Sequence, residues 1–200
     1  MKQTLWCFTL AAIGVLAMLT QLDRQSRYQS DLAELVPENM RYFAQYHSAE
    51  AALSRGDGAA ALTEARTLVA RRPIPAGHLR LLASAQLLNE ENGAGTATLQ
   101  LAGQRGWRDT PTQFALLSFA EAQRDGTQMA RRYFAIWVQQ ENREALKPWA
   151  KIVFANPDAL AEATRLLNAQ GRWQRSFVHF GLRELAPEHA AQFLAGYNPA

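Results

Sequence analysis

Short polar turns divide the middle of the chain into segments of helix length. Each turn places a glycine or proline beside an acid or amide, as in Ser54-Arg55-Gly56-Asp57, Glu91-Asn92-Gly93-Ala94-Gly95, Arg124-Asp125-Gly126 and Ala155-Asn156-Pro157-Asp158. Glycine and proline end helices, and acids and amides cap the next helix by accepting hydrogen bonds from its first backbone N–H groups. The pattern therefore predicts pairs of helices joined by tight turns.

The composition favours helices and offers little material for a sheet. The 200 residues include 36 Ala, 26 Leu and 16 Gln, against 6 Val and 4 Ile. Ala, Leu and Gln are good helix formers, whereas Val and Ile are enriched in strands. We therefore expect an all-α fold, with a length that allows one soluble domain and a short appendage. The single cysteine excludes a disulfide framework and a four-cysteine zinc site.

An uncharged segment at residues 4–22 predicts a transmembrane anchor. Its 19 residues would span about 28 Å as a helix, close to the thickness of the hydrocarbon core. The alternative is a signal peptide, because Lys2 precedes the segment and Ala17 offers a cleavage point. The apolar run continues to Leu22, beyond that point, which favours an uncleaved anchor.

Positive charges flank the anchor on both sides, and they favour opposite orientations. Lys2 before a signal-like core favours export of the body, whereas Arg24 and Arg27 after the span favour a cytoplasmic body. We expect a single-pass protein of the cytoplasmic (inner) membrane with a periplasmic or otherwise extracytoplasmic body. The alternatives are a cytoplasmic body and a cleaved, soluble periplasmic protein.

Small residues recur in the second helix of each predicted pair. Ala61, Ala97, Ala130 and Ala163 follow one another at nearly constant spacing, and the first interval is slightly longer than the other two. A residue four positions later lies on the same helix face, so each alanine is followed by a second contact on that face. The predicted packing residues are Ala61, Ala97, Leu101, Ala130, Phe134, Ala163 and Leu167.

These residues resemble the tetratricopeptide repeat (TPR) family, whose unit is a helical hairpin of about 34 residues. The first unit matches through Gly56-Asp57, Ala61, Leu68 and Pro73, and the third through Phe114, Leu117, Ser118, Ala130 and Phe134. The second unit carries a few extra turn residues, and the fourth has Lys147 and Lys151 at expected apolar places. The resemblance implies an α-solenoid; an irregular all-α bundle is the alternative.

The predicted organisation follows from these segments. It comprises a short tail at residues 1–3, the anchor or signal sequence at 4–22, a stalk helix or linker at 23–41, TPR-like repeats at 42–170 and capping helices at 171–200. The last helix should begin at Pro187-Glu188, since proline and glutamate suit a first helical turn. The aromatic residues interpreted as packing are Trp107, Phe114, Phe119, Phe134, Trp137, Trp149 and Trp173, and for Phe119 a place in a partner groove is an equal alternative.

The sequence contains no motif that predicts catalysis. The four histidines lack the short ligand spacing of metal sites, and Gly93-Ala94-Gly95 has only part of a dinucleotide fingerprint, without a preceding strand. The carboxylate pairs are interpreted as solvated helix ends. We therefore expect no catalytic, metal-binding or cofactor-binding residue and no small-molecule substrate. Nucleic acid is also not expected, because the arginines are scattered among carboxylates instead of concentrated on one face.

The resemblance to the TPR family implies where a partner would bind. In that family the first helices of the hairpins line a concave groove that accepts peptides or helices. The corresponding candidate groove residues are Tyr46, Glu50, Arg80, Ser84, Phe119 and Ile152. We expect a membrane-anchored, non-catalytic adaptor or scaffold that binds a protein or peptide in a bacterial-type envelope complex. The alternatives are a soluble exported binding protein and an all-α enzyme without a recognisable motif.

Overall fold

The computed structural model describes residues 2–139, 143–169 and 172–198, and every regular element within them is a helix. The expectation of an all-α fold is therefore confirmed. The chain divides into two compact units, residues 1–105 (unit 1) and residues 106–200 (unit 2). Residue 1 of the predicted tail, residues 140–142 and 170 of the predicted repeats, and residues 171, 199 and 200 of the predicted cap lie outside the described residues.

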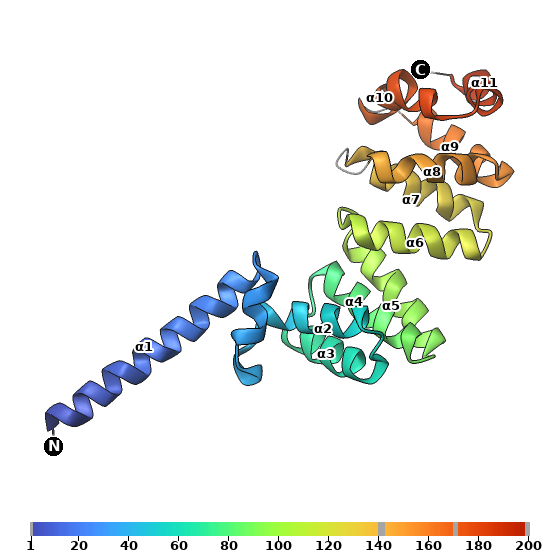
Figure 1. Cartoon of the computed structure of the whole chain (residues 1–200). Helices are drawn as coiled ribbons and strands as arrows, with labels where there is room; N and C mark the ends of the chain where they lie inside the picture. Colours follow the sequence, from blue (N-terminus) through green and yellow to red (C-terminus); the bar gives the residue numbers. More distant parts are fainter. Residues whose placement is uncertain (1, 140–142, 170–171, 199–200) are drawn as a thin grey trace. The chain divides into compact units, whose positions relative to one another are not determined.

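Unit 1 consists of a long N-terminal helix followed by short 3-10 helices and two helical hairpins (Figure 1). Its elements are α1 (Lys2–Ser26), η1 (Ser30–Leu35), η2 (Glu38–Met40), α2 (Ala44–Ser54), α3 (Gly58–Arg71), α4 (Ala76–Leu88) and α5 (Asn92–Arg105). Within this unit α2 contacts α3, α3 contacts α4, and α4 contacts α5. The core between them is mostly alanine with Leu68 and Leu81, and small side chains allow helices to pack closely.

Helix α1 meets the rest of unit 1 only at its C-terminal end. Residues 3–18 are exposed, whereas Leu22 packs against the small cluster formed by Ala33, Val36 and Ala44. The helix continues past the apolar segment to Ser26. The predicted stalk is not one helix but the two 3-10 helices η1 and η2, separated at Pro37, whose ring cannot continue a helix.

The buried carboxylate of Asp23 joins α1 to the first hairpin. Its Oδ1 atom accepts hydrogen bonds from the backbone N–H groups of Tyr42, Phe43 and Ala44 at 2.8, 3.0 and 3.0 Å. These are the donors at the start of α2, which have no partner within the helix itself. Asp23 therefore caps α2 from a distant position earlier in the chain.

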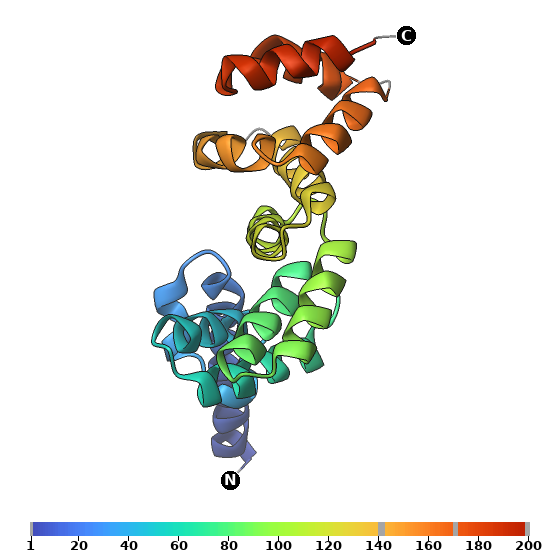
Figure 2. The ribbon, with the colours of Figure 1, turned by 90° about the vertical axis from the view of Figure 1, so that its right-hand side faces the viewer.

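Unit 2 repeats the hairpin arrangement with a different core. Its elements are α6 (Thr110–Ala122), α7 (Gly126–Val138), α8 (Arg143–Phe154), α9 (Pro157–Asn168), α10 (Arg172–Phe180), η3 (Gly181–Glu184) and α11 (Pro187–Gly196). Helix α7 lies against α6, α8 and α9 (Figure 2). The core is rich in aromatic rings, which belong to Tyr133, Phe134, Trp137, Phe154, Phe177 and Phe193.

The turns inside the first three hairpins share one backbone geometry. Gly56, Glu90 and Arg124 have positive φ values of 70°, 62° and 55°, and their positions are equally spaced along the chain. The next residue of each turn donates its N–H to a carbonyl near the end of the preceding helix: Asp57 to Ala52, Glu91 to Gln86 and Asp125 to Ala120, at 3.1, 2.9 and 2.9 Å. This bond is the mark of a Schellman helix ending. The spacing of the three turns equals the TPR period of about 34 residues.

This equal spacing corrects the register predicted for the second hairpin. Five of the predicted packing residues are buried, namely Ala61, Ala130, Phe134, Ala163 and Leu167. Ala97 and Leu101, however, are exposed, and the prediction that they pack is wrong. Gly95 and Leu99 face the core instead, and a Cβ atom on Gly95 would lie 2.7 Å from Leu87 Cγ. A glycine thus makes the small contact, and the turn contains no extra residues.

The corrected register predicts that one of two alanine-to-leucine variants loses stability and the other does not. Ala130→Leu inserts a larger side chain into a fully buried site, which should cost about 1–3 kcal/mol of unfolding free energy. Ala97→Leu changes an exposed site and should stay within about 0.5 kcal/mol of the parent. Urea unfolding followed by circular dichroism measures both. Comparable destabilisation by both variants would favour the original register, in which Ala97 packs as Ala130 does.

Candidate partner-binding surfaces

The six predicted groove residues lie on the first helices of the hairpins. Tyr46 and Glu50 are on α2, Arg80 and Ser84 on α4, Phe119 on α6 and Ile152 on α8. The structure brings Tyr46 and Arg80 together, because Arg80 Nη2 donates a 3.1 Å hydrogen bond to the Tyr46 hydroxyl. Arg80 Nε is buried without a hydrogen-bond partner among the described residues.

The other predicted groove residues differ in exposure. Glu50 is exposed, with one oxygen 3.8 Å from His47 Nδ1, and Ser84 is half-buried. In unit 2, Phe119 is half-buried and Ile152 is 45% exposed. A polar hollow of about 440 Å³ between η1, α2 and α3 includes Glu50 and His47 in its lining. Its remaining side chains are small or charged, so it offers a solvated surface and no apolar anchor point.

An apolar depression in unit 2 involves none of the predicted groove residues. It has a volume of about 360 Å³ and is lined by Trp107, Arg131, Phe134, Ala135, Val138, Leu166 and Trp173. Four of these residues belong to α7 and one to α9, which are second helices of their hairpins. Trp107 is 52% exposed, although its sequence context suggested packing. Exposed tryptophan in a concave apolar surface is typical of protein-binding sites.

The two tryptophans are held at the depression by different means. The Trp107 carbonyl accepts a 3.2 Å hydrogen bond from Gln139 Nε2, which fixes the turn before α6 against the end of α7. The guanidinium carbon of Arg108 lies 4.7 Å from the Trp107 ring centre. The half-buried Trp173 ring lies 5.0 Å from Phe134, measured between ring centres. The Trp107 backbone and the Trp173 ring are therefore placed before any partner arrives, which lowers the entropy cost of binding.

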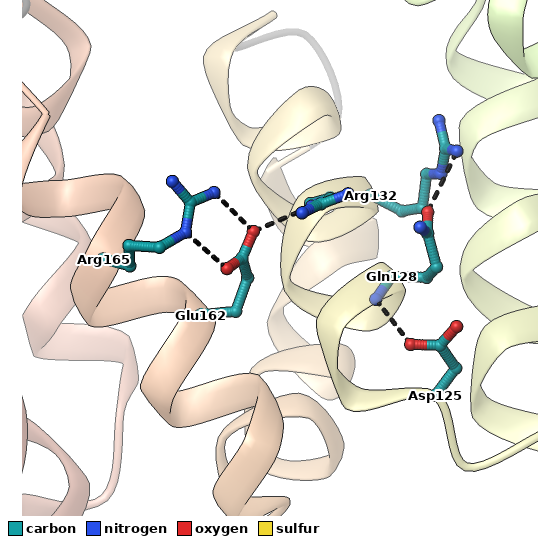
Figure 3. A network of polar contacts seen from close by, with 6 residues as sticks. Asp125, Gln128, Arg132, Glu162 and Arg165 are labelled. Carbon is teal, nitrogen blue, oxygen red and sulfur yellow. Dashed lines mark hydrogen bonds and ion pairs between the residues drawn. The ribbon is translucent and has the colours of Figure 1, made fainter.

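A carboxylate shared by two arginines lies beside the depression (Figure 3). Glu162 is buried on α9 and accepts hydrogen bonds from Arg131 Nε at 2.8 Å and Arg165 Nε at 2.7 Å. These bonds, above all those from Arg165, lower the pKa of Glu162 to about 2. Two positive charges face one negative charge here, and Arg108 adds a third positive charge at Trp107. The surroundings of the depression are therefore basic.

A second polar group holds α6 and α7 together. Arg132 donates to Gln128 Oε1 at 3.1 Å, and Asp125 caps α7 through the Gln128 N–H (Figure 3). Arg132 also donates to Gln113 Oε1 at 3.2 Å. Burial and the neighbouring Arg131 lower the pKa of Arg132. Gln113 is fully buried and also donates to the Gly106 carbonyl. These contacts position the α7 residues that line the depression.

The Glu162 cluster predicts a defined pH dependence of stability. Because the folded protein lowers the pKa of Glu162 from 4.5 to about 2, the cluster stabilises the fold above pH 4.5, and this contribution is lost as the pH falls through 2. Both arginines are exposed, so screening reduces the contribution to about 1–2 kcal/mol. Glu162→Gln should therefore lower stability at pH 7 but match the parent near pH 2. A constant difference from pH 7 to pH 2 in urea unfolding would contradict this assignment.

In the described part of the chain, the one buried histidine has a structural contact and does not belong to a metal-ligating cluster. No group of three or more His, Cys, Asp or Glu side chains is placed there to hold a metal ion. His78 is buried, its Nδ1 lies 2.8 Å from the Arg72 carbonyl, and burial lowers its pKa. It therefore serves the contact between α3 and α4.

Comparison with known proteins assigns no relative to this chain. No family model, no curated protein and no solved structure matches it. The functional conclusion therefore depends on the geometry of the chain itself.

Proposed function

We propose that this protein is a membrane-anchored, non-catalytic adaptor whose TPR-like α-solenoid binds a protein partner in a bacterial-type envelope complex. The repeated turn geometry, at equal intervals that match the TPR period, supports a TPR-like array. In such arrays each hairpin packs on its neighbours and the remaining surface is available for binding.

The proposed anchor is α1. The segment Gln3–Ser26 has a mean hydropathy of 1.9 over its most apolar 18 residues, and none of that window is buried. A core helix of a soluble protein would bury this apolar surface, so exposure supports membrane insertion or a signal sequence. Alkaline carbonate extraction separates the two interpretations: an anchored protein stays in the membrane pellet. Intact-mass measurement of the mature chain would show any loss of the N-terminal residues.

We place the body on the extracytoplasmic side, as the short tail with Lys2 favours. Protease added to spheroplasts should then digest the body while cytoplasmic proteins remain intact. Digestion only after lysis would place the body in the cytoplasm, as Arg24 and Arg27 favour under the positive-inside rule.

The two-tryptophan depression is the observation that carries the binding proposal. Its apolar lining suits one or two apolar side chains of a protein segment, and its basic surroundings suit acidic residues beside them. The partner is therefore a protein segment with apolar side chains flanked by Asp or Glu. The depression lies on second helices, so this proposal differs in location from the first-helix groove that the TPR resemblance implies.

Pull-down from solubilised membranes with quantitative mass spectrometry tests the location of binding. Trp107→Ala and Trp173→Ala should each lower capture of the same proteins about tenfold or more, because truncated aromatic anchors cost about 2 kcal/mol. Leu194→Ala is the control, since Leu194 is exposed on α11 outside the depression. Phe119→Ala and Ile152→Ala test the first-helix groove. Full capture by both tryptophan variants, with loss in Phe119→Ala, would place the partner in that groove instead.

A further inference from the structure

Aromatic rings and arginines gather where the C-terminal end of α1 meets the rest of unit 1. The guanidinium carbon of Arg72 lies 4.8 Å from the Tyr42 ring centre and 4.6 Å from that of Phe43. Arg27 approaches Phe43 and Tyr28 at 5.8 and 5.6 Å. Ile74 follows shortly after Arg72 in the chain. We call this surface the collar, and it consists of Arg27, Tyr28, Tyr42, Phe43, Arg72 and Ile74.

The collar is open to solvent and carries uncompensated positive charge. Tyr28, Tyr42 and Ile74 are 80%, 48% and 81% exposed, although each has a large apolar side chain. Arg27 and Arg72 form no ion pair with a carboxylate of the described residues. The buried carboxylate of Asp23 is directed to backbone N–H groups instead of to these arginines.

The collar lies where the apolar segment of α1 ends. The uncharged residues end at Leu22, and the next residue, Asp23, holds the backbone of Tyr42 and Phe43 by hydrogen bonds of 2.8 and 3.0 Å. If residues 4–22 fill the hydrocarbon core, these rings lie at the level of the lipid headgroups. Tyrosine and arginine are the residues that suit this level, through amphipathic rings and contacts to phosphate.

We propose that the collar binds anionic phospholipid headgroups and thereby holds the first hairpin against the membrane surface. The proposal rests on the proposed membrane insertion of α1. Arg27 and Arg72 would contact lipid phosphates, and Tyr28, Tyr42 and Ile74 would enter the interface. Unit 1 would then be fixed to the bilayer at two places, the span and the collar, instead of turning freely about α1.

Depth measurements in lipid nanodiscs test this proposal with the full-length chain. An environment-sensitive fluorophore is attached at position 74 in an Ile74→Cys, Cys7→Ser variant, and quenching by spin-labelled lipid reports contact with the bilayer. Phosphatidylcholine discs are compared with discs that contain phosphatidylglycerol. Each arginine near an anionic surface should raise the docked-to-free ratio about fivefold, so Arg27→Gln with Arg72→Gln should lower it about 25-fold.

Two controls separate the collar from the anchor. The same fluorophore on the natural Cys7 reports whether α1 is inserted, and it should be quenched in both lipid mixtures and in the double arginine variant. A label in an Ala59→Cys, Cys7→Ser variant, exposed on the first turn of α3 at the opposite end of the hairpin, should not be quenched. Unquenched Cys7 would overturn the anchor itself. Quenched Cys7 with equal quenching at position 74 in both lipid mixtures, or with none, would overturn only the anionic-lipid proposal.

Discussion

Replacing Phe177 by alanine should lower the stability of unit 2 by about 3–5 kcal/mol, the range for a large aromatic side chain removed from a core. Phe177 is fully buried on α10, and five other rings surround it. Its ring centre lies 4.9 Å from Phe134 and 5.1 Å from Trp137. It lies 6.2, 6.3 and 6.4 Å from Phe193, Phe154 and Tyr133. These rings come from α7, α8 and α11, so a cavity here would loosen contacts among four helices.

Tryptophan fluorescence measures this loss selectively. Trp107, Trp137, Trp149 and Trp173 belong to unit 2, and the remaining tryptophan, Trp6, belongs to α1. Unfolding of unit 2 in urea therefore dominates the change in emission. Phe180→Ala is the matched control: Phe180 lies on the same helix but is 54% exposed, so its truncation should have little effect. Equal midpoints for Phe177→Ala and Phe180→Ala would show that the aromatic core is wrongly assigned.

The turns could be predicted from the sequence because their chemistry is local. An acid or amide after a helix-ending residue predicts an N-cap, and the side chains of Asp57, Asp125 and Asn156 accept bonds from the first turns of α3, α7 and α9. The start of the last helix at Pro187 follows from the same local preferences.

The register of the second hairpin could not be predicted in this way. Ala97 and Gly95 are both small, so either could make the small contact between the helices. Only the position of Leu87 shows that residue 95 makes it, because a Cβ atom there would lie too close to the leucine side chain. Glu91 takes the capping position that Asp57 and Asp125 occupy elsewhere, but its carboxylate pairs with Arg66 at 3.1 Å. Glu91 is longer by one methylene group than the aspartates and does not mark a cap. The sequence therefore does not show the equal spacing of the turns, although the backbone has it.

The two candidate binding surfaces also differ in whether the sequence could predict them. The first-helix positions of Tyr46, Arg80 and Phe119 follow from helix order alone. The depression instead joins Trp107, from a turn, to Trp173, at the start of α10, and several helices separate the two in sequence. Whether an aromatic residue faces the core or solvent at such a place depends on helix packing, and no periodicity marks it.

Replacing Asp23 by alanine should cost about 2–4 kcal/mol, the second-largest effect we expect, because three backbone N–H groups lose their acceptor together. The Asp23 side chain is almost fully buried, so water replaces the lost carboxylate only if the joint opens. Ser26 is buried beside it, and its hydroxyl donates to the Asp23 carbonyl at 2.6 Å. The alanine variant would therefore loosen the start of α2 and the end of α1 at once.

Hydrogen–deuterium exchange of the full-length protein locates this effect. The amides of Tyr42, Phe43 and Ala44 should exchange at least about tenfold faster in Asp23→Ala, since each kilocalorie of lost local stability raises opening about fivefold. Asp23→Asn keeps one oxygen acceptor of the same size and should lose less than half as much. Unchanged exchange at these amides in Asp23→Ala would mean that Asp23 does not fasten α1 to the first hairpin. The bond from Ala44 to Asp23 joins α1 and α2 directly, because its donor and its acceptor belong to the two helices themselves.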